Sequence, residues 1–143
     1  KAADKTAETI VHGWLHTGDI GHLDADGYLH ITDRKKDMII TGGFNVYPSE
    51  VEQVIWSHPA VQDCAVIGVP DEHWGEAVTA VVELNAGQRV SADELIALCK
   101  DRLGSVKAPK SVEFVDSLPR SPVGKVLKKD LRAKYWQNVD RRI

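Results

Sequence analysis

The sequence has little of what marks a membrane protein, a metalloprotein or a nucleic-acid-binding protein. Its 143 residues include two cysteines, Cys64 and Cys99, which lack the spacing of metal ligands. No apolar run is long enough to cross a bilayer. The net charge of −3 argues against bulk attraction to nucleic acid or to an anionic membrane. Both cysteines lie in apolar segments, so we expect buried free thiols and a reducing compartment.

The charges that are present are unevenly distributed. Acidic residues dominate positions 43–106, whereas basic residues dominate from Lys107 onward, and residues 34–36 form a second basic cluster. Two separate basic clusters on a net acidic chain favour a local anionic ligand over a polyanion. A nucleic-acid binder that uses the basic C-terminal helix stays open as an alternative, although we expect no interleaved exposed aromatic residues there and the flanks of the helix are acidic.

Short strands and tight turns are predicted for the N-terminal part. Residues 13–34 read as two or three strands around a tight turn at 24–27, and residues 36–48 read as a hairpin. The strands before Asp33 are too few to build a core of their own. We therefore expect residues 1–32 to be the end of a larger domain outside this chain, and residues 1–12 to be disordered or held by a neighbouring chain.

An alternating order of helices and strands follows Asp33. Pro48 and Ser49 fit the first turn of a helix that Pro59 ends, and a capping box at 91–94 opens a helix through Leu103. The remaining predicted elements are strands at 60–70, 76–84 and 111–115, a loop at 116–124, and a last helix at 128–136 with Leu127, Leu131 and Tyr135 on its inner face.

Several motifs occur in one register. The segment GWLHTGDIGHLDADGYLHITDRKKDMIITGGFNVYPSEVEQVIWSHPAVQDCAVIGVPDEHWGEAVTAVV, followed by LPRSPVGKVLKKDLR, resembles the C-terminal part of the adenylate-forming (AMP-binding) enzymes, and more closely an acyl-CoA synthetase (fatty-acid or aryl-acid CoA ligase). The resemblance covers residues 13–135. The motifs TGD, DRKKDMIITGGFNVYPSEVE and PxxxxGK are weak signals singly, but their order and spacing together are specific.

The resemblance implies an α/β (α+β) fold. Residues 34–143 would form a small mixed sheet flanked by helices, the mobile C-terminal domain of these enzymes, and residues 1–32 would be the last strands of the large N-terminal domain. Residues 33–34 would be the hinge, with Asp33 absorbing the dihedral change as the small domain swings. The alternative for Asp33 is a surface ion-pair cluster with its charged neighbours, which would add little stability.

The resemblance also implies a two-step ligase reaction. A carboxylic acid would attack the α-phosphate of ATP to give an acyl-adenylate and pyrophosphate, and the thiol of CoA would then displace AMP. Phe44 replaces a glutamate common in the family, which favours a fatty acid. The N-terminal domain would hold the Mg²⁺ of ATP, this chain would hold no metal, and the protein would be cytoplasmic. We expect residues 1–143 alone to be inactive.

Lys125 matches the catalytic lysine of the family. Its ammonium would lie where the carboxylate meets the α-phosphate, two negative groups that need a cation between them. Gly124 would let the backbone approach the ligand closely. The segment is no P-loop, because Pro119 and Val126 stand where that motif requires Gly and Ser or Thr. The alternative is a solvated lysine, which Gly-Lys alone would suggest.

Three further residues match nucleotide contacts of the family. Asp19 would take the vicinal ribose hydroxyls of ATP and AMP with its two oxygens. Arg34 would contact the ribose or a phosphate, and Lys36 corresponds to a lysine that touches the acyl-adenylate. Alternatively, Asp19 is a turn aspartate that satisfies its own backbone.

Gly42, Gly43, Lys107 and Lys110 are the candidate CoA contacts. The family places the Gly42-Gly43 loop against the nucleotide and the pantetheine arm of CoA, where missing side chains leave room for a narrow thiol tunnel. In isolation the glycine pair is a hairpin turn. The two lysines would meet the CoA phosphates. We interpret the tryptophans of this part of the chain as packing residues: Trp56, Trp74 and Trp136.

Two other functions stay open. An amino-acid or aryl-acid adenylation domain would deliver its acyl group to the pantetheine of a carrier protein, although DRKKDMIITGG departs from the hinge sequence usual in peptide synthetases. A non-enzymatic, ligand-binding remnant of the fold would differ from a ligase in lacking an intact ATP-binding loop in the larger domain.

Overall fold

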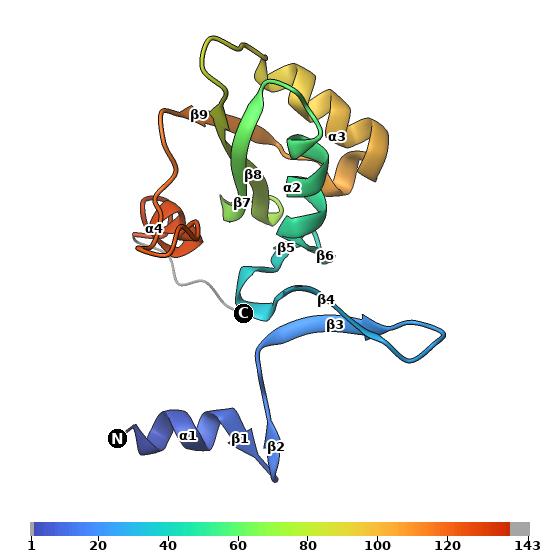
Figure 1. Cartoon of the computed structure of the whole chain (residues 1–143), viewed down its shortest axis with the longest axis vertical. Coiled ribbons are helices and arrows are strands. Elements are labelled where there is room, and N and C mark those ends of the chain that lie inside the picture. Colours follow the sequence, from blue (N-terminus) through green and yellow to red (C-terminus); the bar gives the residue numbers. More distant parts are fainter. Residues whose placement is uncertain (1, 138–143) are drawn as a thin grey trace. The chain divides into compact units, whose positions relative to one another are not determined.

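The computed structural model describes residues 2–137, which form two compact units divided between Lys36 and Asp37 (Figure 1). The hinge expected at residues 33–34 lies just before this division. A 3₁₀ turn, η1 (Lys35–Asp37), carries the chain from one unit into the other.

The N-terminal unit consists of one helix and two hairpins. Its elements are α1 (Ala3–Thr9), β1 (Ile10–Val11), β2 (Trp14–Leu15), β3 (Asp19–Leu23) and β4 (Leu29–Arg34). β1 pairs with β2 and β3 pairs with β4, both antiparallel. The turn expected at 24–27 joins β3 to β4, where the Asp24 amide donates to the Tyr28 carbonyl over 3.0 Å. Residues 3–9 form an exposed helix, whereas we expected residues 1–12 to be disordered or held by a neighbouring chain.

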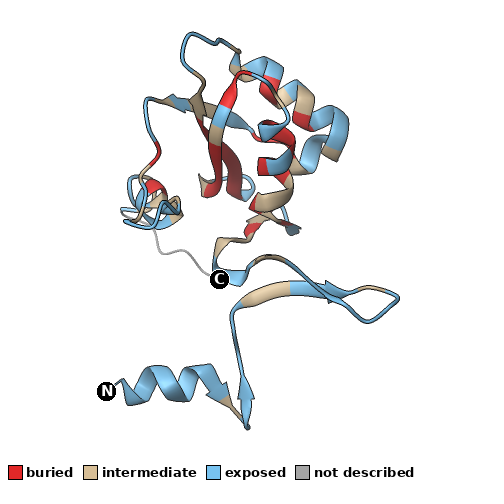
Figure 2. Ribbon diagram, in the orientation of Figure 1, coloured by how far each residue is buried: buried red, intermediate tan, exposed pale blue. Residues whose placement is uncertain are grey.

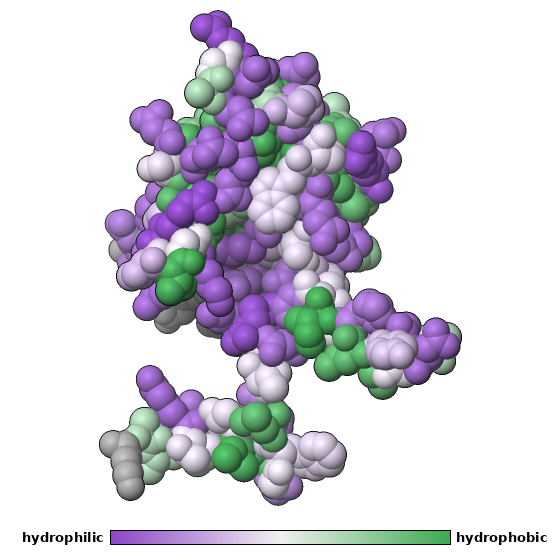
Figure 3. Space-filling model, viewed as in Figure 1, coloured by the Kyte–Doolittle hydropathy of each residue, from purple (hydrophilic) through white to green (hydrophobic). Residues whose placement is uncertain are grey.

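The N-terminal unit has no buried core. None of residues 2–36 is buried (Figure 2), and Figure 3 shows hydrophobic side chains at its surface. Trp14 is 76% exposed and Tyr28 is 71% exposed. Two short hairpins cannot bury such groups by themselves, so this unit needs another surface to cover them.

A five-stranded mixed sheet forms the C-terminal unit. The strands are β5 (Ile39–Thr41), β6 (Phe44–Val46), β7 (Val61–Asp71), β8 (Gly75–Leu84) and β9 (Ser111–Val115), and the helices are α2 (Pro48–Trp56), α3 (Ala92–Lys107) and α4 (Lys128–Ala133). The order is β6-β5-β8-β7, all antiparallel, with β9 parallel to β8. No helix among the described residues has the length and apolarity to cross a membrane.

The strands β7 and β8 are covered on both faces. Cys64 and Val66 of β7 belong to the core that α2 and α3 cover, whereas Ala65 and Ile67 belong to a second core that α4 covers. Figure 2 shows the buried parts of the central strands in red. Successive side chains of a strand point to opposite faces, so burial of both faces explains why these strands read as continuous apolar runs.

Most predicted elements of this unit are confirmed, with some ends shifted. α3 continues to Lys107 only across a kink at Gly104, where φ is +80°, so the regular helix ends near Leu103 as expected. α4 is shorter than the helix predicted at 128–136. Leu131 and Tyr135 pack on the second core as predicted. Leu127 is 36% exposed, and its assignment to the inner face was wrong.

Two ion pairs fasten α4 to the rest of the unit. Arg132 Nη1 lies 2.8 Å from Asp37 Oδ1, and both side chains are only 13% exposed. Lys128 Nζ lies 2.7 Å from Glu52 Oε1, which also accepts the amide of Val66. Removing one partner of a pair this well buried leaves an uncompensated charge, so these contacts hold α4 against the sheet.

The two thiols of this unit should resist modification in the native protein. Cys64 and Cys99 are buried, and burial raises the pKa of Cys99 to about 11 and the pKa of Cys64 even further. At pH 8 we expect reaction with a disulfide reagent such as Ellman's reagent to be slow without denaturant, and to give two thiols per chain in denaturant. Stoichiometric labelling within the mixing time of the native protein would contradict this packing.

Candidate active site

The loop expected at 116–124 is confirmed, and its last residues form a tight hairpin that presents Lys125. The Ser121 amide donates to the Lys125 carbonyl at 2.8 Å, and the Lys125 amide donates to Ser121 Oγ at 3.2 Å. The Gly124 amide also donates to the Ser121 carbonyl, at 2.8 Å, with φ at +83°. Only glycine adopts this conformation without strain, so Gly124 shapes the turn that exposes the lysine.

The side chain of Lys125 differs from most of the basic side chains around it. Five basic residues of the C-terminal region are engaged with acidic partners: Lys107, Arg120, Lys128, Arg132 and Lys134. Lys125 is exposed, and no salt bridge among residues 2–137 involves it. A cation in this state is available to an anionic ligand.

The N-terminal unit brings two of the predicted nucleotide contacts together. Asp19 and Arg34 are register partners on β3 and β4, and Arg34 Nη1 lies 2.6 Å from Asp19 Oδ1. The Asp19 amide donates to Thr17 Oγ1 at 3.1 Å, which orients the start of the strand. Asp33 Oδ1 accepts the amide of Arg34 at 2.7 Å. Lys36 lies in η1 and is exposed.

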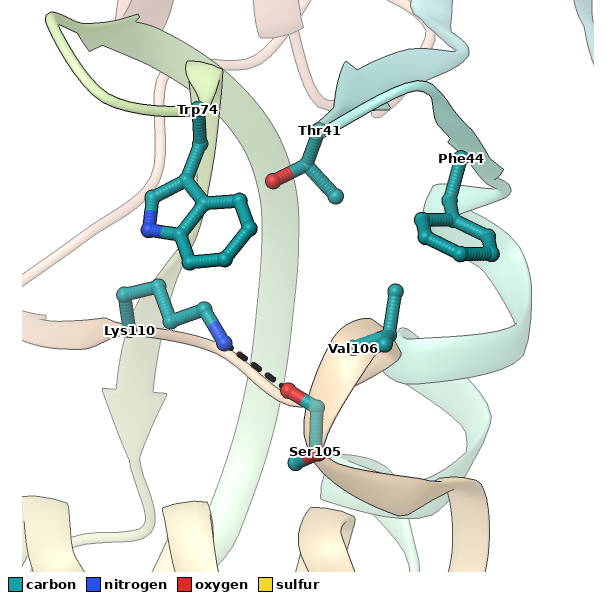
Figure 4. A pocket seen from close by; sticks show the side chains of 6 residues that line it. All are labelled: Thr41, Phe44, Trp74, Ser105, Val106 and Lys110. Carbon is teal, nitrogen blue, oxygen red and sulfur yellow. Dashed lines mark hydrogen bonds between the residues drawn. The ribbon is translucent and has the colours of Figure 1, made fainter.

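An open pocket of about 190 Å³ lies beside the Gly42-Gly43 turn. Its walls come from β5, β6, the β7–β8 turn and the segment that ends α3 and precedes β9; the lining residues are Thr41, Phe44, Trp74, Ser105, Val106 and Lys110. Figure 4 shows the rings of Trp74 and Phe44 on opposite sides of the pocket. Lys110 Nζ donates to the Ser105 carbonyl at 2.8 Å. The pocket therefore combines two aromatic rings with one ammonium.

Trp74 is held in this pocket by its own turn and by a bare glycine. Asp71 Oδ1 accepts the amides of His73 and Trp74 at 2.9 and 2.8 Å, and the Gly42 amide donates to the Trp74 carbonyl at 2.9 Å. A Cβ on Gly42 would lie 2.6 Å from Cε3 of the indole. Gly42 thus makes room for the Trp74 ring.

Of the two remaining candidate CoA contacts, Gly43 lies beside this pocket and Lys107 lies outside it. Gly43 completes the β5–β6 turn with φ at +83°, and nothing lies within 4 Å of a Cβ added to it. Lys107 does not line the pocket, because its Nζ lies 2.6 Å from Glu50 Oε2 in a separate cleft between α2 and α3. Among residues 2–137, His, Cys, Asp and Glu side chains do not gather in threes to hold a metal ion.

The interpretation of the tryptophans as packing residues was wrong for Trp56 and incomplete for Trp74. Trp56 is 50% exposed and Trp74 is 46% exposed, whereas Trp136 is partly buried and donates to the Gly68 carbonyl. The position of Trp74 in a turn between two long strands, just before Gly75, is the signal in the sequence that could have identified it.

The hairpin of Lys125 and the Trp74 pocket lie next to different cores, which are on opposite faces of the sheet. Val126, next to Lys125, packs on the core that α4 covers. Ser105 and Val106 of the pocket lie at the end of α3, which packs on the opposite core. The C-terminal unit therefore offers two separate surfaces for two ligand groups.

Comparison with known proteins identifies the family. The family model of the AMP-binding enzyme C-terminal domain matches residues 50–125. The fatty acid–[acyl-carrier-protein] ligase ScoC of Streptomyces coeruleorubidus is 49% identical, covering 98% of this chain and 27% of that protein. The medium/long-chain-fatty-acid–CoA ligase FadD8 of Mycobacterium tuberculosis is 52% identical, covering 98% of this chain and 26% of that protein.

A solved structure agrees with these relatives. ATP-bound MatB from Rhodopseudomonas palustris superposes with a TM-score of 0.87 at 45% identity, covering 92% of this chain and 26% of that chain. The chain belongs to the AMP-binding enzyme C-terminal domain family. This confirms the family and the α/β fold class inferred from the sequence. The chain spans about a quarter of the length of these relatives.

The contact between Gly42 and Trp74 can be tested directly. We expect Gly42→Ala to displace the indole, because the added Cβ would lie inside the van der Waals distance of the ring. The indole N–H resonance of Trp74, assigned with Trp74→Phe, should shift. Gly87→Ala is the matched control, since its φ is +73° but nothing lies within 4 Å of the added atom. An unchanged Trp74 resonance in Gly42→Ala would contradict the packing.

Proposed function

We propose that the chain is the C-terminal part of an ATP-dependent acid–thiol ligase. The intact protein would activate a carboxylic acid with ATP to an acyl-adenylate and would then transfer the acyl group to CoA. The observation that carries this proposal is the state of Lys125. This lysine is exposed, has no salt bridge among residues 2–137, and ends a hydrogen-bonded hairpin within the region that matches the family model.

Lys125 serves the first half-reaction. A carboxylate oxygen forms a bond to the α-phosphorus, and the bond from that phosphorus to the pyrophosphate oxygen breaks. The attacking carboxylate and the α-phosphate are both negative and are brought together in the transition state, where a preorganised ammonium between them reduces their repulsion and stabilises the charge on the phosphate oxygens. Mg²⁺, held by the larger domain, would share this task at the phosphates.

Asp19 and Arg34 would hold the ribose of the nucleotide. The carboxylate of Asp19 can accept hydrogen bonds from the two ribose hydroxyls, and the guanidinium of Arg34, 2.6 Å from Oδ1, orients it. Asp33 and Lys36 follow in the same segment, Asp33 as the hinge and Lys36 as a second contact to the adenylate. These roles rest on the family's motif and on the Asp19–Arg34 geometry.

The Trp74 pocket suits the nucleotide end of CoA in the second half-reaction. The thiol attacks the acyl carbonyl, the bond from that carbon to the phosphate oxygen breaks, and AMP leaves. An indole offers its face to adenine, and the ammonium of Lys110 suits a phosphate. The pantetheine arm would then run past Gly42 and Gly43, which border the pocket.

The pocket also bears on the choice of acceptor. The printed names of the relatives differ, since one names an acyl carrier protein and the other names CoA. Carrier-bound pantetheine has no adenine nucleotide, so a pocket whose indole and ammonium suit adenine and phosphate supports CoA. Phe44 lines this pocket. Its side chain would therefore affect binding of the thiol acceptor rather than the choice of carboxylic acid. The proposal of a fatty acid rests on the names of the two relatives.

Lys125→Ala should separate the two half-reactions of the intact protein. Without the ammonium, acyl-adenylate formation measured by pyrophosphate exchange should fall by about 10²–10³. Thioester formation from ready-made acyl-adenylate should persist, because the lysine acts where carboxylate and α-phosphate meet. Gly43→Leu should do the reverse, with Gly43→Ala as the control for backbone strain at φ +83°. Equal loss in both half-reactions for both variants would reject a divided site.

Trp74→Ala and Lys110→Ala should each lower kcat/KM for CoA by about tenfold or more. Neither should change kcat/KM for free pantetheine, which has no nucleotide to bind. Lys107→Ala, measured by the same kcat/KM for CoA, tests whether the lysine paired with Glu50 also contacts the CoA phosphates. If the variants leave CoA use unchanged and the intact protein prefers pantetheine on a carrier protein, the carrier-protein alternative holds. Absence of any adenylate formation would favour the ligand-binding remnant.

A further inference from the structure

We propose that Arg120 is a positioning residue for Lys125. Its guanidinium fastens the hairpin that carries Lys125 to the end of the β7–β8 pair, and so sets where the ammonium lies during adenylate formation. The inference rests on the proposed role of Lys125, and it concerns a residue that acts through that lysine.

The anchor point is an unfavourable pair of acidic residues. Asp63 of β7 and Glu83 of β8 are direct register partners, next to the irregularity between Val61 and Asp63. Their side chains are only 17% and 12% exposed. Like charges directly opposite each other on neighbouring strands are destabilising, so this end of the strand pair requires a cation between the two carboxylates.

Arg120 supplies that cation and also reaches the hairpin. Its Nη2 lies 2.6 Å from Asp63 Oδ2 and 3.5 Å from Glu83 Oε2. Its Nη1 donates to the Gly124 carbonyl at 3.4 Å. The hydrogen bond that the guanidinium donates to Asp63 raises the pKa of Arg120. One guanidinium thus links the sheet to the residue that precedes Lys125.

The two carboxylates are themselves fixed by rigid elements. Asp63 Oδ1 accepts Trp56 Nε1 at 3.0 Å and the Cys64 amide at 2.8 Å. Glu83 Oε2 accepts the Leu118 amide at 3.1 Å. The two carboxylates that accept hydrogen bonds from Arg120 therefore belong to a hydrogen-bond network across α2, β7 and β8. Through Arg120, this network fixes the position of the hairpin relative to the sheet.

The internal hydrogen bonds of the hairpin do not replace this link. They fix the shape of residues 121–125, and Leu118 and Val126 place the base of the hairpin on the second core. Arg120 is the contact from the sheet to the far end of the turn. Because a displacement of about 1 Å can cost on the order of 10² in rate, the link matters for a lysine that must meet two reacting groups.

The test compares two half-reactions in the intact protein. Arg120→Met should lower kcat for adenylate formation by about 10- to 100-fold, with KM for ATP and for the acid nearly unchanged. Thioester formation from supplied acyl-adenylate should stay within about twofold of the wild-type rate. Arg120→Lys should recover little, because a single ammonium lacks the fork that reaches both the carboxylates and the Gly124 carbonyl.

A double mutant shows whether Arg120 acts through Lys125. In a Lys125→Ala background, Arg120→Met should cause no further loss of adenylate formation, since the positioned group is already absent. The matched control is Lys134→Met, which removes a different ion pair, between the C-cap of α4 and Glu113 of β9 (2.6 Å), and leaves the contacts of Arg120 in place. Its two half-reactions should match those of the wild type.

The outcomes separate the inference from the function on which it rests. If Lys125→Ala leaves adenylate formation intact, the proposed function fails. If Lys125→Ala has its effect but Arg120→Met slows both half-reactions equally, or adds its full loss to Lys125→Ala, Arg120 is only structural and the inference is overturned. Should Arg120→Met not fold, Asp63→Asn takes its place, and an unchanged adenylation rate in folded Asp63→Asn also overturns it.

Discussion

Burial of both faces of the β7–β8 pair is the constraint on which the rest of the C-terminal unit depends. A strand pair covered by α2 and α3 on one face and by α4 on the other can expose polar groups only at its ends and edges. The candidate groups lie at those places. Trp74 occupies the turn at one end, and the Asp63–Glu83 pair that receives Arg120 lies toward the other.

The same constraint explains how the basic C-terminal segment is used. The sequence suggested a local anionic ligand for the whole cluster, but the structure pairs most of these cations with acidic residues of the sheet and of α2, as Arg120 does with Asp63 and Lys128 with Glu52. The acidic middle of the chain and its basic end therefore neutralise each other within one unit. Three exposed lysines of this segment, Lys110, Lys125 and Lys129, have no ion-pair partner among residues 2–137, and Lys125 is the one that lies in the hairpin.

The sequence predicts those features that depend on neighbours along the chain. The apolar runs of β7 and β8, the Ser91 capping box and the PxxxxGK motif are local patterns, and each has its counterpart in the structure or in the family. The Trp74 pocket was missed because it depends on packing between Gly42 and a turn more than thirty residues away. Arg120 was missed because its carboxylate partners are 57 and 37 positions distant.

The ion pair between Asp37 and Arg132 joins residues 95 positions apart, at the start and near the end of the described part of the C-terminal unit. Because this contact joins the start of the unit to α4, neither segment can open without breaking a contact that also holds the other. The first strand of the unit and its last helix are therefore expected to open as one cooperative segment, with amide protection that rises and falls together. A substitution of Asp37 or of Arg132 would therefore destabilise both segments.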